Sequence, residues 1–333
     1  MEYIDIVHNF HSVIYDNTVY MYNLFGKDIL PKYITLINGF EDLIKLLYKV
    51  HGFKLPSIDI VYPNIIYNLN LVDYKSTILL GFSGGLDSVY DALKLRDDGY
   101  NVILFHINNL NKAYPKEDEF AQYFAINQNF KYITLDANHL HKEYYIDNPL
   151  KNQLILASMI DYGIQHNISI YALGADNNTY IKDARIGMTI TDSIEVNQLF
   201  WQGVQKYFPD AELKLIPNDI KKYDRLKYII EHHNDALNDI YSCITPHRFN
   251  NMLHNNNEKK YNVKLLNGRC GSCFKCCMEI ILLTELGYYN KDEELLKHCW
   301  KILSDSKNSH RKDLFDKHIP LEIRYKNIMN YGS

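Results

Sequence analysis

A glycine-rich stretch directly after an apolar run is the first part of this sequence that could carry out chemistry. Residues 77–80 (TILL) lead into the stretch SGGLDS, which comprises Ser83, Gly84, Gly85, Leu86, Asp87 and Ser88. Glycine has no Cβ and adopts positive φ readily, so this backbone can wrap closely around an anion, and the amides of a following helix start point at that anion. A carboxylate such as Asp87 is repelled by phosphate oxygens unless a cation such as Mg²⁺ lies between them. We therefore expect this loop to bind pyrophosphate together with Mg²⁺.

The loop matches neither of the two commoner phosphate-binding patterns. No G-K-[ST] follows the glycines, as a Walker A loop requires, and there is no G-x-G-x-x-G. A simpler interpretation is a tight turn in which Ser88 is the N-cap of a helix and Asp91 closes a capping box. That interpretation explains neither the two glycines nor Asp87, so the sequence favours phosphate binding.

Four of the six cysteines fall in one segment, CGSCFKCC at residues 270–277. In a reducing compartment such a cluster indicates metal binding rather than disulfides. Three thiolates at this spacing, Cys270, Cys273 and Cys276, together with Cys243 upstream, can surround Zn²⁺ tetrahedrally. No position is then left open for catalysis, so we expect a structural site that is separable from nucleotide binding.

Alternatives remain open at this metal site. His247, four residues beyond Cys243, is a rival fourth ligand, and an iron–sulfur cluster is the rival metal centre. Adjacent Cys276 and Cys277 are not expected to reach one ion together, so Cys277 and Cys299 are predicted to stay unbound. The interpretation of all these residues as ordinary core cysteines does not explain three within seven residues.

Apolar runs alternate with helix-length stretches through the middle of the chain. The runs expected to form strands are 77–82, 101–107, 131–137, 168–174 and 212–217, and the expected helices are 88–98, 116–129, 149–166, 193–207 and 219–233. This alternation predicts an α/β fold of Rossmann-like type, a doubly wound, five-stranded parallel sheet with helices on both faces. In such a fold ligands bind beyond the carboxyl ends of the strands, which is where the glycine-rich loop lies.

Three zones follow from this pattern. Residues 1–75 form an N-terminal extension of unknown role, with helical spacing at 34–50 and a strand-like run at 58–62. Residues 76–240 form the nucleotide-binding domain, and residues 241–333 form a metal-binding, helical C-terminal region. The polar spacer of that region contains His254-Asn255-Asn256-Asn257, which we expect to be a loop.

Composition excludes several classes of protein. The chain has 333 residues, 47% of them hydrophobic, which is ordinary for a globular protein and argues against disorder. A formal net charge of -4 gives no strong signal for nucleic-acid binding. The N-terminal residues MEYIDIVHNF do not resemble a signal peptide, and no apolar run approaches the length of a membrane helix. We expect a cytoplasmic protein without membrane contact.

The S-G-G-x-D-S stretch resembles the signature of the PP-loop ATP pyrophosphatases, which cleave ATP to AMP and pyrophosphate while adenylating a substrate oxygen. The C-G-x-C-x-x-C run at 270–276 resembles the zinc site of one branch, the 7-cyano-7-deazaguanine synthases of queuosine biosynthesis. The resemblance implies an adenine nucleotide alpha hydrolase type of fold, with ATP, Mg²⁺ and Zn²⁺ as cofactors. It also implies a deazaguanine substrate, ammonia and a homodimer. Asp87, Ser88 and Lys222 would be its catalytic residues.

Weaker matches lie between the two motifs. Residues 148–152 (NPLKN) resemble that family's P-G-R-N segment, which implies that Lys151 and Asn152 bind the substrate, although a proline here also suits an ordinary helix start. Asp176, after the fourth strand, either approaches the nucleotide or its metal or is a turn residue. Lys222-Tyr223-Asp224 resembles the family's K-x-E, whose lysine meets the phosphates, and a solvated lysine is the other interpretation.

The sequence also departs from that family. Its G-Q-R-H segment is replaced by residues 108–111 (NNLN), its D-C-R segment has no clear counterpart, and the spacer from Cys243 to Cys270 is longer. The resemblance therefore supports ATP chemistry better than the conversion of 7-carboxy-7-deazaguanine to its amide or nitrile. Attachment to a macromolecular acceptor, as in relatives from antiviral defence gene sets, stays open. So do two other classes, a tRNA-modifying PP-loop enzyme and a non-catalytic nucleotide-binding scaffold.

Overall fold

The computed structural model divides into two compact units that interleave along the chain. It describes residues 14–15, 18–19, 76–108, 116–136, 152, 155–156, 159–160, 162–163, 166–175, 194–205, 210–217, 220–245, 247–305 and 321–330. The sheet unit takes the described residues of Met1–Phe82, Lys94–Lys112 and Phe130–Asp219. The helical unit takes those of Ser83–Leu93, Ala113–Asn129 and Ile220–Ser333.

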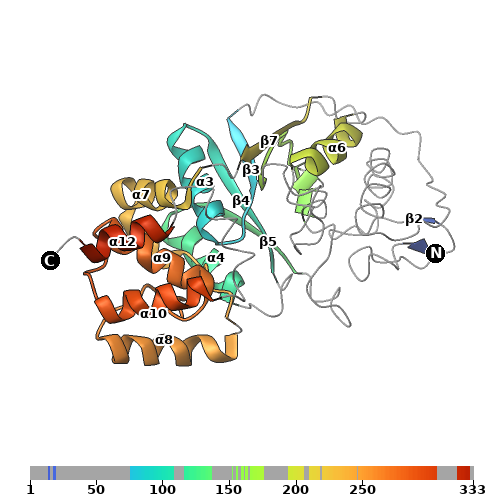
Figure 1. Cartoon of the computed structure of the whole chain (residues 1–333). Coiled ribbons are helices and arrows are strands. Elements are labelled where there is room, and N and C mark those ends of the chain that lie inside the picture. The colour runs from blue at the N-terminus through green and yellow to red at the C-terminus, as the bar shows by residue number, and fades with distance from the viewer. Residues whose placement is uncertain are drawn as a thin grey trace. The chain divides into compact units, whose positions relative to one another are not determined.

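The sheet unit is built on five parallel strands (Figure 1). They are β3 (Thr77–Gly81), β4 (Asn101–Asn108), β5 (Lys131–Asp136), β6 (Ile170–Ala175) and β7 (Glu212–Pro217). Their order is β5-β4-β3-β6-β7, and each neighbouring pair is parallel. The chain builds outward from β3 on one side and then on the other, so the direction of winding reverses beside β3. The predicted doubly wound, Rossmann-like parallel sheet is confirmed.

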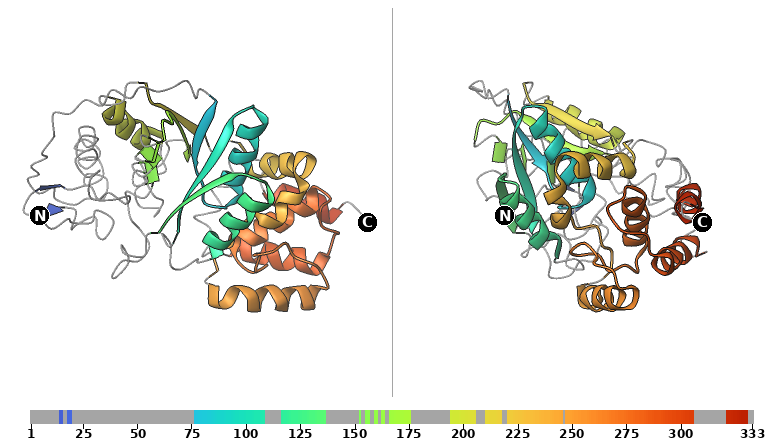
Figure 2. Two further views of the ribbon diagram at one scale, coloured as in Figure 1. Left: turned by 180° about the vertical axis from the view of Figure 1, so that it is seen from behind. Right: turned by 90° about the vertical axis from the view of Figure 1, so that its left-hand side faces the viewer.

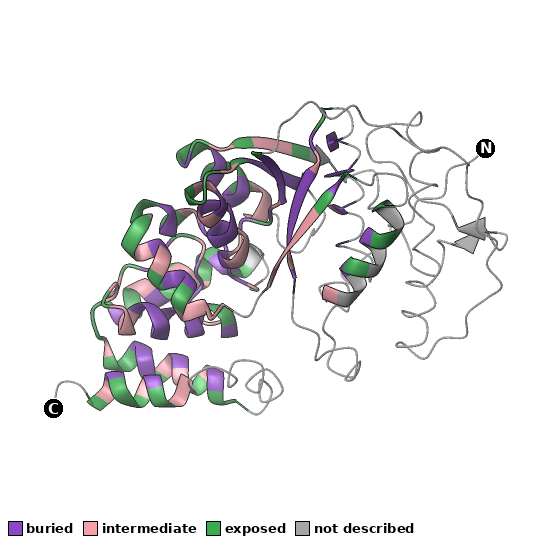
Figure 3. Ribbon diagram, turned by 90° about the horizontal axis from the view of Figure 1, so that it is seen from above, coloured by how far each residue is buried: buried purple, intermediate pink, exposed green. Residues whose placement is uncertain are grey.

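Burial explains why the inner strands read as continuous apolar runs. Ile78, Leu79 and Leu80 of β3 are fully buried although their side chains alternate between the two sheet faces. Strands β4 and β6 beside it are also mostly buried, whereas the edge strands β5 and β7 are partly exposed, and Figure 3 shows both kinds of strand. Strands buried on both faces are typical of parallel sheets. Helix α6 (Ile194–Gln205) contributes Trp201, whose ring lies 5.5 Å from that of Tyr171 on β6. The described residues between 152 and 163 are also helical.

The helical unit contains the start of α3 and the helices of the C-terminal region. Its members are α3 (Leu86–Asp97, up to Leu93), α4 (Lys116–Asn127), α7 (Lys222–His232), the 3-10 helix η6 (Asn234–Asp239), α8 (His247–Tyr261), α9 (Phe274–Glu285), α10 (Glu293–Ser304) and α12 (Leu321–Asn330). Helix α9 packs against α10 and α12, and Figure 2 shows this group from two sides. The apolar residues of α9 are buried along almost its whole length, so α9 forms the centre of this unit.

One alternative interpretation and one local prediction are wrong. Helix α3 begins at Leu86, so Ser88 lies inside the helix and is not the N-cap of a capping box with Asp91. The asparagine run 255–257, predicted as a loop, lies within α8. Asparagine is a poor helix former, but α8 buries Asn250 and Asn257 in hydrogen bonds to the neighbouring segment, and these contacts outweigh the intrinsic preference.

Little of the N-terminal extension is described. Its described part is a two-stranded antiparallel pair, β1 (Ile14–Tyr15) with β2 (Thr18–Val19). The predicted helix at 34–50 and the predicted strand at 58–62 lie outside the described residues. Among the described helices, none has the length and apolar character needed to cross a membrane.

Candidate phosphate pocket and cysteine cluster

The glycine-rich loop, residues 83–88, has the backbone that close contact with an anion requires. Gly84 has a φ of 73°, and a Cβ at this position would lie 3.1 Å from the backbone nitrogen of Ala121 in α4. The Gly84 carbonyl accepts a hydrogen bond from the Tyr241 amide at 2.9 Å. The Ser83 and Ser88 hydroxyl oxygens lie 3.1 Å apart at the mouth of the loop. The loop is therefore held by contacts within the helical unit, and its two hydroxyls are close enough to act on one ligand.

We expect Gly84→Ala to destabilise the protein and Gly85→Ala to do so far less. Alanine at Gly84 combines positive φ with a close backbone contact, which should cost about 1–3 kcal/mol of unfolding free energy. Gly85 does not have positive φ, and its nearest neighbour to a new Cβ would be the Ser83 hydroxyl oxygen at 3.4 Å. Urea denaturation of both variants measures the difference. Equal losses in the two variants would contradict this account of the loop.

Asp87 is held by two cations from α7. Lys222 Nζ lies 3.3 Å from each carboxylate oxygen, and Arg225 Nη1 lies 2.8 Å from Oδ1. Burial alone would raise the pKa of Asp87, but Lys222, then Arg225 and Lys275, together lower it to about 2. The side chain is nevertheless 41% exposed. Asp87 is therefore an ionised and accessible carboxylate, which is what a Mg²⁺ ligand requires.

Arg225 connects Asp87 to a second carboxyl group, that of Asp91, for which the sequence suggests only a capping role. The Arg225 side chain is 1% exposed, and its guanidinium lies 5.3 Å from the centre of the Tyr90 ring. Asp91, one turn after Asp87, is also buried. Burial raises the pKa of Asp91 to about 7, and the charge of Arg225 offsets part of that rise. These buried neighbours fix the guanidinium that in turn orients Asp87.

The loop lines a pocket of about 130 Å³ within the helical unit, here called the phosphate pocket. Its charged lining groups are Asp87, Glu117 of α4, Lys222 of α7 and Lys275 of α9, and residues 241–244 complete the wall. Whole ligands usually occupy cavities of about 300–1,000 Å³, so a pocket of this size suits one end of a ligand. Two ammonium groups beside a glycine loop suit a phosphate end.

The second candidate centre is the cysteine cluster, formed by Cys243, Cys270, Cys273 and Cys276. All four sulfur atoms lie within 4.8 Å of one another, and Cys243 Sγ is 3.9 Å from Cys273 Sγ. Cys277 and Cys299 are buried but do not belong to this group. The structure therefore brings together the four cysteines predicted as metal ligands, while the side chain of His247 lies outside the described residues.

Hydrogen-bond donors surround these sulfur atoms, as thiolate ligands require. The amides of Ser272 and Cys273 donate to Cys270 Sγ at 3.3 and 3.2 Å, and the Thr245 amide donates to Cys243 Sγ at 3.3 Å. Asn250 adds a side-chain donor to Cys243 Sγ at 3.0 Å. Such donors stabilise negative charge on sulfur and orient metal ligands. A closed set of four thiolates fits Zn²⁺ and leaves no open coordination position.

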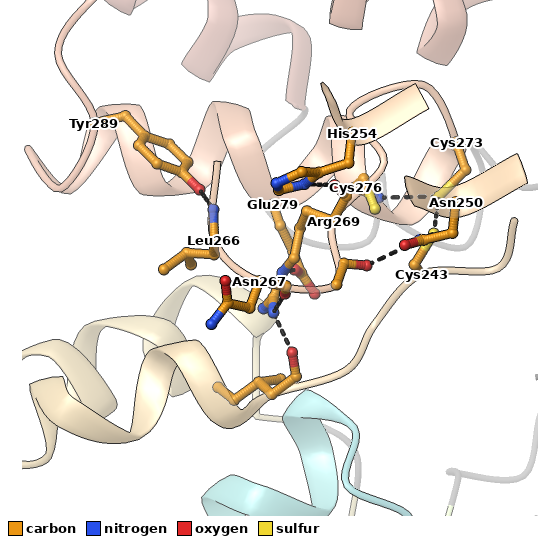
Figure 4. Close-up of polar contacts among 12 residues, drawn as sticks. Cys243, Asn250, His254, Leu266, Asn267, Arg269, Cys273, Cys276, Glu279 and Tyr289 are labelled. Carbon is orange, nitrogen blue, oxygen red and sulfur yellow. Dashed lines mark hydrogen bonds and ion pairs between the residues drawn. The ribbon is translucent and has the colours of Figure 1, made fainter. Parts of the chain in front are cut away.

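Helix α8 and a buried ion pair hold the cysteine cluster in place (Figure 4). The Asn257 side chain donates to the Cys270 carbonyl at 2.7 Å, and Asn250 donates to the Gly268 carbonyl at 3.1 Å. Arg269, buried beside the cluster, pairs with Glu279 of α9 at 3.0 Å and donates to the Ile240 carbonyl. One guanidinium thus links the segment before Cys243 to α9, the helix that contains Cys276.

Of the three remaining predicted site residues, Lys151, Asn152 and Asp176, the structure describes only Asn152. Asn152 is buried on a helix of the sheet unit, and Lys151 and Asp176 lie outside the described residues. Sequence reasoning missed Glu117, Arg225 and Lys275. Of these three residues, only Arg225 could have been suggested from the sequence. It lies three positions after Lys222 and therefore on the same face of the predicted helix.

Comparisons with known proteins find similarity to a tRNA-modifying enzyme in sequence and to several solved structures. No protein-family model matches the chain. The chain is 30% identical over 118 residues to the tRNA-specific 2-thiouridylase MnmA 1 of Aliarcobacter butzleri, a match that covers 30% of this chain and 34% of that relative. The match thus spans about a third of the relative's length. This similarity supports the resemblance to the PP-loop ATP pyrophosphatases.

The structural likenesses are distant. A predicted subunit of tRNA methyltransferase from Methanocaldococcus jannaschii shares 19% identity at a TM-score of 0.28, covering 46% of this chain and 74% of that one. An NH3-dependent NAD synthetase from Campylobacter jejuni shares 15% identity at a TM-score of 0.31, covering 87% of this chain and 97% of that one. TM-scores this low do not establish a shared fold.

Proposed function

We propose that this chain is an ATP-dependent, PP-loop adenylating enzyme that releases pyrophosphate. The observation that carries the proposal is the phosphate pocket, in which the SGG loop, the ionised Asp87 and Lys222 line one cavity. The similarity to a 2-thiouridylase supports the same superfamily. ATP would bind with its phosphates in this pocket.

The proposed reaction is adenylation of a carboxylate. A substrate carboxylate oxygen attacks the α-phosphorus of ATP, the bond from that phosphorus to the bridging β-oxygen breaks, and pyrophosphate leaves with the electron pair. Mg²⁺, when bound at Asp87, supplies charge neutralisation between the phosphates and the carboxylate. The backbone at Gly84 and Gly85 approaches the leaving group closely, Ser83 and Ser88 offer hydroxyl donors, and Lys222 neutralises charge. Positioning and electrostatic stabilisation then account for catalysis.

For the substrate we propose a 7-carboxy-7-deazaguanine, converted with ammonia to its amide or nitrile or attached to a macromolecular acceptor. The support is the cysteine cluster, since four thiolates after the nucleotide-binding domain resemble the zinc site of the 7-cyano-7-deazaguanine synthases. A cytoplasmic homodimer belongs to the same proposal. The second candidate is tRNA modification, which the similarity to a tRNA-specific 2-thiouridylase favours.

Product analysis tests the proposal. Incubation with ATP, Mg²⁺ and 7-carboxy-7-deazaguanine should give AMP and pyrophosphate, which chromatography separates from ADP. Pyrophosphate release that requires tRNA, with zinc replaced by a brown iron–sulfur chromophore, would favour the second candidate. Formation of ADP and phosphate would contradict the PP-loop assignment. Tight ATP binding with no pyrophosphate release, whatever carboxylate or tRNA is offered, would identify a non-catalytic scaffold.

A further inference from the structure

The cysteine cluster carries a lysine that lines the phosphate pocket. Lys275 lies between two cluster members in the sequence, two residues after Cys273 and one before Cys276. It is the second residue of α9, its side chain is exposed, and it lines the same cavity as Ser83, Gly85 and Asp87. The segment that holds the cluster therefore also contributes to the wall of the pocket.

Lys275 differs from the other lysine of the pocket in its contacts. Lys222 is engaged by both oxygens of Asp87. Within the part of the chain that the structure describes, Lys275 forms no hydrogen bond or ion pair. It is nonetheless close enough to Asp87 to help lower the pKa of that carboxyl group. Of the two pocket lysines, Lys275 is thus the one whose ammonium donors are not used by any described residue and can serve a ligand.

The backbone that carries Lys275 is fixed by the cluster. The Cys276 amide donates to Cys273 Sγ at 3.5 Å, and the Cys277 amide donates to the Cys273 carbonyl at 2.9 Å. Cys273 is the N-cap of α9, so the position of its sulfur defines where the helix starts. A metal ion that binds Cys273 and Cys276 would hold the intervening residue from both sides.

We propose that Lys275 is a phosphate-binding residue, which the cysteine cluster positions against the pyrophosphate end of the nucleotide. This inference rests on the proposed function. Its ammonium would donate to phosphate oxygens in the phosphate pocket, so that Lys222, Lys275 and a Mg²⁺ ion held by Asp87 would together neutralise charge on the leaving group. Metal in the cluster and nucleotide in the pocket are then coupled, in contrast to the separable sites expected from the sequence.

The test is binding of Mg²⁺-pyrophosphate to the zinc-loaded full chain, measured by titration calorimetry. Lys275→Met keeps the length of the side chain and removes its charge, and it should weaken binding about tenfold, as expected for one charge-assisted hydrogen bond. Lys275→Arg should retain most of the affinity. Lys264→Met is the matched control, because Lys264 is exposed in the same unit but does not line the pocket, and it should bind as the unsubstituted chain does.

Metal content and thermal unfolding separate binding from folding. All three variants should keep their zinc and their melting temperature. Equal pyrophosphate affinities in Lys275→Met and Lys264→Met would overturn the role of Lys275 and leave the proposed function standing. Absence of pyrophosphate and ATP binding in the unsubstituted chain would overturn both.

Discussion

Replacing Asp87 with asparagine is expected to lower the rate of pyrophosphate release from ATP by at least about a hundredfold. Asparagine keeps the shape of the side chain and removes the charge that would hold Mg²⁺ against the phosphates. The low pKa of Asp87, about 2, means that the carboxylate is fully ionised at every pH at which the enzyme would work. Single-turnover release of labelled pyrophosphate measures the loss. The residual activity should require a higher concentration of Mg²⁺ for half saturation.

A folding control is needed because Asp87 also balances buried charge. Without its carboxylate, the buried guanidinium of Arg225 loses an ion pair, so Asp87→Asn should also lower the melting temperature. Asp98→Asn is the matched variant, since Asp98 is exposed at the end of α3 and pairs only with Lys94 among the described ion pairs. If Asp87→Asn releases pyrophosphate as fast as Asp98→Asn does, Asp87 has no role in the mechanism.

The sheet could be predicted because parallel strands leave a strong signal. The inner strands β3, β4 and β6 are mostly buried on both faces, so they read as nearly uninterrupted apolar runs such as residues 77–80. The glycine-rich loop could also be singled out as a candidate site, because its motif lies in six consecutive residues and needs no distant partner to be recognised. The strand order required the structure, since the pattern of apolar runs does not say on which side of β3 each later strand pairs.

The supporting residues could not be predicted, because their roles depend on contacts between distant segments. Lys275 appears in the sequence as a residue of the cysteine run, and only the folded chain places it in one cavity with Asp87. The loop predicted at the asparagine run of α8 is an error of the opposite kind. The asparagines of this helix suggest a loop by intrinsic preference, but Asn250 and Asn257 are buried hydrogen-bond donors to the segment around Cys270. A polar residue buried in a helix carries no sequence signal that separates it from a solvated one.

Replacing Cys276 is expected to have the largest effect on stability. We expect Cys276→Ser to lose zinc and to unfold the region that the cluster ties together, from Cys243 through α8 to the start of α9. Binding energy at a structural zinc site is folding energy, on the order of 10 kcal/mol in small zinc modules at neutral pH. Metal analysis together with hydrogen exchange of α8 measures both consequences. Protection of the α8 amides should fall with the zinc content, because the described side-chain hydrogen bonds of Asn250 and Asn257 are to the cluster segment and to Lys116 of α4.

Cys277→Ser is a closely matched control. Cys276 and Cys277 are adjacent on α9 and both are fully buried, but only the Cys276 sulfur belongs to the cluster. The Cys277 thiol instead lies 3.7 Å from the Gly271 carbonyl, a contact that a serine hydroxyl can replace. Cys277→Ser should therefore keep zinc and lose little stability, as should Cys299→Ser. About one zinc ion per chain in Cys276→Ser would exclude the cluster as the metal site. Loss of zinc in His247→Ala but not in Cys243→Ser would identify His247, in place of Cys243, as the fourth ligand. Zinc loss in Cys276→Ser that leaves pyrophosphate affinity unchanged would show that the metal does not position Lys275.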